Sequence, residues 1–270
     1  MNRLQTLFAD TRAHNRAALI PYIAAGDPSP LLTVPLMHAL VDAGADVIEL
    51  GVPFSDPMAD GPVIQRATER ALTHGVSLRT VLEMVMDFRR QNQHTPVVLM
   101  GYANPIEAMG IEQFAKEAAA VGVDGVLTVD YPAEESQPIT DALASNGLAN
   151  IFLVAPTTPV AREQATLAQA SGFIYYVSLR GVTGAQLSDL DEVRRKVEEL
   201  KGQTDIPVGV GFGIRDAQTA ERMAAFADAV VVGSALIQAI EAVADQGEAM
   251  IIAAAQSVLK PMRAALQRSA

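Results

Sequence analysis

The sequence predicts a closed (β/α)8 barrel. Short apolar runs rich in β-branched residues alternate with amphipathic stretches of helical length along the chain, and this alternation is typical of a parallel sheet covered by helices. Eight such units fit the roughly 250 residues of a typical barrel. An open, doubly wound sheet would show the same alternation and is the alternative. No linker rich in Gly and Ser divides the 270 residues, so we expect a single domain, 1–270.

Eight apolar runs are the expected strands. Each is apolar almost throughout, as is typical of a parallel strand that is covered on both faces. In chain order, the runs are 19–24, 46–50, 97–100, 125–129, 151–154, 173–178, 208–211 and 229–232.

Amphipathic stretches follow these runs and are expected to form the helices. Ser77 stands where an N-cap is needed, and Gly44, Gly122 and Gly172 stand where helices should end. The expected helices are 31–43, 63–72, 78–91, 111–121, 134–145, 162–171, 190–200 and 219–227, with extra N-terminal and C-terminal helices at 4–14 and 247–268.

The composition excludes several classes of protein. The chain has no Cys, which excludes disulfides, thiolate catalysis and thiolate metal sites and fits a reducing compartment. Its net charge of −11 disfavours nucleic acid as a partner. Asp10 and Arg12 stand where a secretory leader needs apolar residues, and the longest apolar stretch, 229–237, is too short to span a membrane. We therefore expect a cytoplasmic protein with no nucleic acid and no membrane as partner.

Glu49 stands near the carboxyl end of an expected strand, where barrels carry their active sites. Two-residue alternation places Glu49 on the same face as Val47. If that face points into the barrel, the carboxyl is partly desolvated, which raises its pKa towards the range of a general acid or base. The alternative is an ordinary solvated glutamate at a strand end.

The loop that follows, 51–62, contains Asp56, Asp60 and three prolines, a composition too rich for a simple connection. Asp60 is the second candidate for chemistry. Its alternative role is to cap the next helix, with Pro62 in the first turn. Asp56 precedes Pro57 and could equally be a turn residue.

Glycine-containing turns at 181–184, 209–213 and 233–234 are candidates for a phosphate site. The last two follow the seventh and eighth expected strands, where barrels often bind phosphate through backbone N–H groups and a helix N-terminus. The alternative is that these glycines only make tight turns.

No residue is placed for a Schiff base or a metal site. The lysines, Lys116, Lys196, Lys201 and Lys260, fall in helical stretches and not at strand ends. The four histidines show no metal-ligand spacing. We therefore expect acid–base chemistry by carboxylates on a small phosphorylated molecule.

The segment from Glu49 to Pro62, ELGVPFSDPMADGP, closely resembles the signature of the tryptophan synthase alpha chain family. Residues 21–28, 102–105, 181–185, 209–214 and 233–235 resemble the same family, so the likeness extends along the whole chain. The resemblance implies a (β/α)8 TIM barrel lyase of tryptophan biosynthesis. Its reaction would be the retro-aldol cleavage of indole-3-glycerol phosphate to indole and D-glyceraldehyde 3-phosphate.

The resemblance also implies roles for individual residues. Glu49 would act as general acid and then base, and an ionised Asp60 would accept the indole N–H. Residues implied to position the substrate are Tyr175, Thr183, Tyr22, Met100, Leu127, Val129, Leu153 and Phe212. Residues implied to bind the phosphate are Gly184, Gly213, Gly233 and Ser234. Two features depart from the family: Tyr22 replaces the usual Phe, and Leu179-Arg180 differs from familiar forms.

Members of this family work with a beta chain, so the resemblance implies a partner that carries pyridoxal phosphate, within an alpha2-beta2 heterotetramer. This chain would then hold no cofactor and no metal, and the loop with Pro53 and Asp56 would face the partner. Two alternatives remain open. One is a free-standing lyase that releases indole, and the other is a catalytically silent barrel that binds a phosphorylated ligand and activates a partner.

Overall fold

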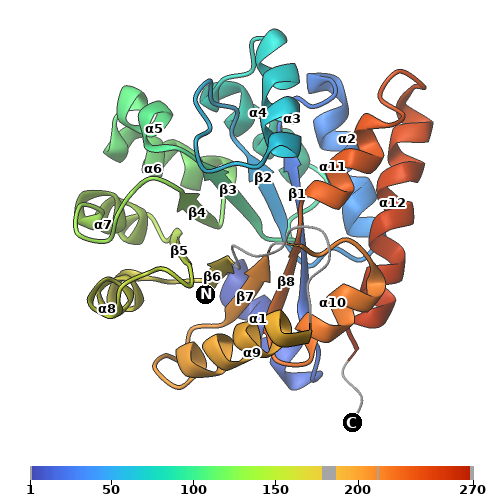
Figure 1. Ribbon diagram of the computed structural model, residues 1–270. Coiled ribbons are helices and arrows are strands. Elements are labelled where there is room, and N and C mark those ends of the chain that lie inside the picture. The colour runs from blue at the N-terminus through green and yellow to red at the C-terminus, as the bar shows by residue number, and fades with distance from the viewer. Residues whose placement is uncertain (1, 178–186, 212, 268–270) are drawn as a thin grey trace.

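The chain forms a closed parallel barrel (Figure 1). The structure is a computed structural model that describes residues 2–177, 187–211 and 213–267, with the backbone alone for 187–189. The strands pair in chain order, and β8 pairs with β1 to close the ring through Ala18 opposite Ala229. This closure confirms the barrel and excludes the open, doubly wound sheet.

All strands are buried along nearly their whole length, as the apolar runs predict. The strands are β1 (Ala18–Ala24), β2 (Ile48–Gly51), β3 (Val97–Gly101), β4 (Gly125–Thr128), β5 (Ala149–Val154), β6 (Ile174–Val177), β7 (Val208–Gly211) and β8 (Ala229–Val232). Two strands start two residues away from the expected position, and β1 and β6 start one residue away. β2 begins two residues late because the Asp46 carboxylate binds Arg16 and the Leu19 N–H instead of continuing the strand. β5 begins two residues early because Ala149 already pairs with Gly125.

Helices surround the barrel (Figure 1). The outer ring consists of α2 (Pro30–Asp42), α4 (Leu78–Arg89), α6 (Ile111–Val121), α7 (Gln137–Ser145), α8 (Val160–Gln169), α9 (Leu187–Lys201), α10 (Ala217–Ala224) and α12 (Glu248–Ala265). Two predicted helix ends are confirmed in detail. Ser77 caps α4 by accepting the Thr80 N–H, and Gly122 ends α6 in the left-handed conformation with φ of 90°.

Further helices are additional to this ring. They are α1 (Arg3–Ala13) before β1, α3 (Pro62–Thr73) after β2, α5 (Ala103–Met109) after β3 and α11 (Ser234–Glu241) after β8. The sequence analysis missed α5 and α11. α5 is short and contains Pro105, which is typical of a turn, and the first residues of α11 continue the apolar run of β8.

The barrel interior is apolar, and α1 closes its amino-terminal end. Val47 lies in the interior cluster, which confirms the face predicted for β2. Leu4 and Phe8 of α1 join that cluster, and the Phe8 ring lies 5.9 Å from the ring of Phe173. This end of the barrel is therefore filled, and the opposite end carries the candidate site.

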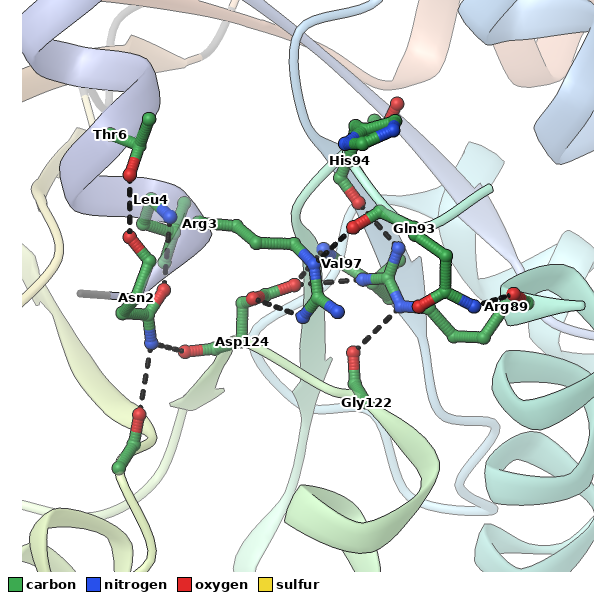
Figure 2. Close-up of polar contacts among 12 residues, drawn as sticks. Asn2, Arg3, Leu4, Thr6, Arg89, Gln93, His94, Val97, Gly122 and Asp124 are labelled. Atoms are coloured by element: carbon green, nitrogen blue, oxygen red, sulfur yellow. Dashed lines mark hydrogen bonds and ion pairs between the residues drawn. The ribbon is translucent and has the colours of Figure 1, made fainter. Parts of the chain in front are cut away.

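Charged groups fasten α1 to the same end of the barrel, as Figure 2 shows. The Asp124 carboxylate accepts hydrogen bonds from Arg3 at 3.0 Å and from the buried Arg89 at 2.8 Å. Asn2 donates to the backbone carbonyls of Asp124 and Gly147. Asp124 therefore joins α1 to the outer helices. Among the described residues, no helix is long and apolar enough to cross a membrane.

Candidate active site

Glu49 points into the barrel near the carboxyl end of β2. It pairs with Tyr22 of β1 on one side and Val98 of β3 on the other. The side chain is only 1% exposed, and neither carboxylate oxygen has a hydrogen-bond partner among the residues that the structure describes. Burial, and secondarily the charge of Asp60, raises the pKa of Glu49 from 4.5 to about 8. These observations contradict the alternative of a solvated glutamate at a strand end.

Asp60 faces the same end of the barrel from the loop between β2 and α3. Its Oδ2 accepts a hydrogen bond from the Tyr102 hydroxyl at 3.1 Å, and that hydroxyl accepts the Ala59 N–H at 3.1 Å. Burial raises the pKa of Asp60 from 3.8 to about 6, against the lowering effect of the Tyr102 hydrogen bond. The N-cap of α3 is Gly61, so the helix-capping alternative for Asp60 is wrong, although Pro62 does begin the helix.

The two carboxyl groups therefore differ in charge near neutral pH. With pKa values of about 8 and about 6, Glu49 holds its proton at pH 7 while Asp60 is ionised. Burial is the larger cause of both shifts, and the negative charge of Asp60 adds to the shift of Glu49. This arrangement supplies a proton donor beside a fixed negative charge.

Two buried tyrosines, Tyr22 and Tyr175, lie near the two carboxyl groups. Burial and the nearby charges of Glu49 and Asp60 raise the pKa of both phenols well above 10.0. Each hydroxyl lies against a glycine of the next strand in the barrel. A Cβ on Gly51 would lie 2.2 Å from the Tyr22 hydroxyl, and one on Gly211 would lie 2.2 Å from the Tyr175 hydroxyl. Only glycine leaves room for these rings.

A narrow pocket lies beside Asp60. Four of its lining residues were predicted from the sequence: Tyr22, Asp60, Met100 and Val129. The remaining lining residues are Val52, Phe54, Pro57, Thr68, Gly101 and Tyr102. The Phe54 and Tyr102 rings are stacked with their centroids 5.2 Å apart. Most of the lining residues are thus apolar or aromatic, and one of them carries a carboxylate. Leu127 and Leu153 lie deeper, in the interior cluster.

Sequence reasoning missed the roles of Tyr102, Gly51 and Gly211. Tyr102 directly follows β3, so its place after a strand end was a usable signal. Gly51 lies two residues after Glu49 and therefore shares its inward face. The need for glycine there follows only from the position of the Tyr22 ring, which no local pattern shows.

The candidate phosphate residues lie after β7 and β8. Gly213 has φ of 72°, and Gly233 directly precedes α11. Within the described ranges no side chain caps α11, and Ser234 at its first turn is exposed, so the backbone N–H groups there can receive an anion. Gly184, Thr183 and Phe212 lie outside the described residues, as do Leu179 and Arg180.

The loop predicted to face a partner is only partly accessible. Asp56 is exposed and accepts a hydrogen bond from Ser55, whereas Pro53 is buried. Met58 of the same loop is 83% exposed. In the part of the chain that is described, no cluster of His, Cys, Asp or Glu could hold a metal ion. All four lysines lie on outer helices, away from the strand ends.

Comparisons with known proteins identify the family. Residues 8–267 match the family model described as tryptophan synthase alpha chain. The alpha chain of Alkalilimnicola ehrlichii is 59% identical over 266 residues, which are 98% of this chain and 97% of that protein. The alpha chain of Bordetella parapertussis is 60% identical over 271 residues, or 98% of this chain and 95% of that protein.

Solved structures agree with the sequence comparisons. The crystal structure of tryptophan synthase subunit alpha from Legionella pneumophila has a TM-score of 0.91 and 45% identity, with 98% of each chain covered. A tryptophan synthase structure from Mycobacterium tuberculosis has a TM-score of 0.88 and 37% identity over 99% of each chain. The chain therefore belongs to the tryptophan synthase alpha chain family, the lyases that cleave indole-3-glycerol phosphate in tryptophan biosynthesis.

Proposed function

We propose that Glu49 moves the protons in the cleavage of indole-3-glycerol phosphate. The bond between C3 of the indole ring and the adjacent carbinol carbon breaks when the ring gains a proton at C3 and the carbinol hydroxyl loses one. A protonated Glu49 can donate the first proton and its carboxylate can take up the second, so protons balance without a co-reactant. The observation that carries this role is a buried, unpartnered carboxyl with a pKa of about 8.

We infer that Asp60 stabilises the positive charge that the ring acquires on protonation. That charge is shared with the ring nitrogen, and an ionised carboxylate that accepts the indole N–H favours it. The pKa of about 6 supports an ionised Asp60 at neutral pH. Tyr102 supports the geometry because its hydroxyl occupies Oδ2, which leaves Oδ1 for the ligand.

The pocket beside Asp60 is the proposed site for the indole ring. Its walls are the side chains of Tyr22, Met100, Val129 and the stacked pair of Phe54 and Tyr102, and a flat apolar ring needs such walls. Leu127 and Leu153 support the pocket from the barrel interior, and Tyr175 would orient the ring against Glu49.

The phosphate of the substrate would bind at the opposite wall of the site, on Gly213, Gly233 and Ser234. Backbone N–H groups at the start of α11 provide the positive end of a helix dipole. This local arrangement explains how a chain with a net charge of −11 can bind an anionic substrate. Thr183, Gly184 and Phe212 are proposed for the same substrate on the family resemblance alone.

A substitution that adds a negative charge at Gly213 tests the phosphate site. Gly213→Asp should raise KM for indole-3-glycerol phosphate because its carboxylate repels the phosphate. The matched control is Gly213→Asn, since both substitutions put a side chain of nearly the same shape on a backbone with φ of 72° and only Asp is charged. Equal KM values for the two variants would remove Gly213 from the site.

The reaction itself is tested by indole release. Glu49→Gln and Asp60→Asn should each lower the rate of indole release from indole-3-glycerol phosphate by about 10²-fold or more. Matched controls are Glu83→Gln and Asp87→Asn, because both remove exposed carboxylates of the outer helix α4. Full activity in either site variant would overturn its assigned role. A parent chain that stays inactive both alone and with a beta chain would favour the silent phospholigand-binding barrel.

Membership in an alpha chain family implies a beta-chain partner, and we propose an alpha2-beta2 heterotetramer in which the partner carries pyridoxal phosphate. The exposed Asp56 and the 83% exposed Met58 support a docking role for this loop. Lyase rates with and without the beta chain separate this proposal from a free-standing lyase, whose rate would not change. The single domain over 1–270 and the cytoplasmic location stay predictions of the sequence.

A further inference from the structure

Four charged side chains link α3, α11 and the loop between β1 and α2. Arg70 of α3 donates to both carboxylate oxygens of Asp27, at 2.6 and 3.0 Å, and to Oε1 of Glu241 at 2.7 Å. Arg66, one turn earlier, donates to both oxygens of Glu241, at 2.9 and 2.8 Å. Asp27 lies between β1 and α2, and Glu241 is the last residue of α11. We call these four residues the bridge network.

The bridge network has a buried end that requires its partner. Asp27 is only 2% exposed, and burial raises its pKa while the hydrogen bonds and charge of Arg70 lower it. A buried carboxylate without a partner is strongly unfavourable. Arg70 is therefore held in one geometry by Asp27, and both ends of its guanidinium fork are used.

An apolar layer lies beneath the bridge network. Ile64 and Ala67 of α3, Ile237 of α11, and Tyr22 and Ala24 of β1 pack in one cluster. This cluster is separate from the main core. Apolar contacts below and bidentate ion pairs above thus join α3 to α11, although the two helices are far apart in the sequence.

The starts of these two helices are the two ends of the proposed substrate site. α3 begins at Pro62, two residues after Asp60, and α11 begins at Ser234, directly after Gly233. A shift of α3 relative to α11 would therefore move the indole-binding carboxylate relative to the phosphate-binding turn. Both helices pack on β1, and α11 also packs on α12 of the outer ring, so the bridge network adjusts a separation that β1 and α12 already limit.

We propose that Arg66 and Arg70, with Asp27 and Glu241, are positioning residues that set the distance between Asp60 and the N-terminus of α11, and hence the length of ligand that binds at both. This inference rests on the proposed function. When a ligand is held at one end, the binding of its other end is intramolecular. The affinity gained from this second contact depends on how well the length of the ligand matches the distance between the two contacts. A change in this distance should weaken the binding of a ligand that spans both contacts. It should not change the binding of fragments that use only one contact.

The test compares three probes on Glu241→Gln and Arg66→Gln. Indole-3-propyl phosphate spans both contacts and lacks the hydroxyl needed for cleavage, whereas indole and glycerol 3-phosphate each use one contact. Titration calorimetry or ligand-detected NMR should show an affinity for the spanning probe about tenfold weaker than in the parent. Affinities for the two fragments should change less than about twofold. KM for indole-3-glycerol phosphate should rise in the same variants in which the affinity for the spanning probe falls.

Arg16→Gln is the matched control. Arg16 also donates to two carboxylate oxygens, of Asp46 at 2.8 Å and of Asp10 at 3.2 Å, but it lies just before β1 at the opposite end of the barrel. It should leave all three affinities unchanged. Equal changes for the spanning probe and the fragments, or no change for any of them, would overturn the inference alone. A parent chain that does not bind the spanning probe would overturn both this inference and the proposed function.

Discussion

Glu49 makes the folded chain less stable as the pH rises, and Glu49→Gln should remove this effect. The pKa of Glu49 is raised from 4.5 to about 8 in the folded chain. Between these two values the folded chain keeps a proton that the unfolded chain has released. Stability falls with rising pH wherever the folded state binds more protons than the unfolded state. A glutamine of nearly the same shape carries no charge at any of these pH values.

The size of the effect follows from the pKa difference. One pKa unit corresponds to about 1.4 kcal/mol, so a rise from 4.5 to about 8 corresponds to roughly 5 kcal/mol in full. Because of Glu49, the free energy of unfolding is lower by less than about 1 kcal/mol at pH 5 and by about 4 kcal/mol at pH 8. The free energy of unfolding of Glu49→Gln, relative to the parent, should therefore rise by about 3 kcal/mol between the two.

Urea denaturation at pH 5 and at pH 8, at equal ionic strength, measures this difference. Asp60 is present in both proteins, so its own titration enters the comparison only through its interaction with Glu49. The control is Glu83→Gln on α4, where the carboxylate is exposed. For this control the difference from the parent should change by less than about 0.5 kcal/mol.

The same substitution should abolish most of the lyase activity, because glutamine cannot exchange the proton that the reaction needs. A more stable and less active variant is the expected signature of a functional group that is held in an unfavourable environment. If the stability difference between parent and Glu49→Gln were the same at both pH values, Glu49 would not be protonated at neutral pH. Its assignment as the general acid would then fail.

Three further predictions follow from the site and the barrel floor. The dependence of kcat/KM on pH should be bell-shaped, rising near pH 6 as Asp60 ionises and falling near pH 8 as Glu49 loses its proton; initial rates that show a single limb would contradict the two-carboxylate assignment. Tyr102→Phe should move the rising limb to higher pH, because the Tyr102 hydrogen bond lowers the pKa of Asp60 in the parent and its removal raises that pKa. An unchanged profile would remove Tyr102 from the site. Leu4→Ala should lower the free energy of unfolding by about 2–5 kcal/mol, since the fully buried Leu4 side chain lies against Gly125 and Gly172; a loss below about 1 kcal/mol in urea titration would show that the floor relaxes to fill the space.

The predicted elements show which features are local. All eight apolar runs became strands, and the alternation of Val47 and Glu49 correctly placed the carboxyl inside the barrel. A strand covered by helices must be apolar on both faces. A charged residue within such a run therefore stands out without knowledge of its neighbours. Local patterns failed for α11, because its first residues prolong the apolar run of β8.

The sequence by itself therefore determined the barrel, the family and the inward direction of Glu49, because periodicity and motif spacing are properties of neighbouring residues. Only the tertiary structure excluded helix capping for Asp60, since Gly61 is the N-cap of α3 and the Asp60 carboxylate accepts a hydrogen bond from Tyr102, which follows β3. It also decided the pKa values, because desolvation depends on every element packed around a carboxyl. The bridge network joins residues of α3, of α11 and of the loop between β1 and α2, so it exists only once the barrel has closed.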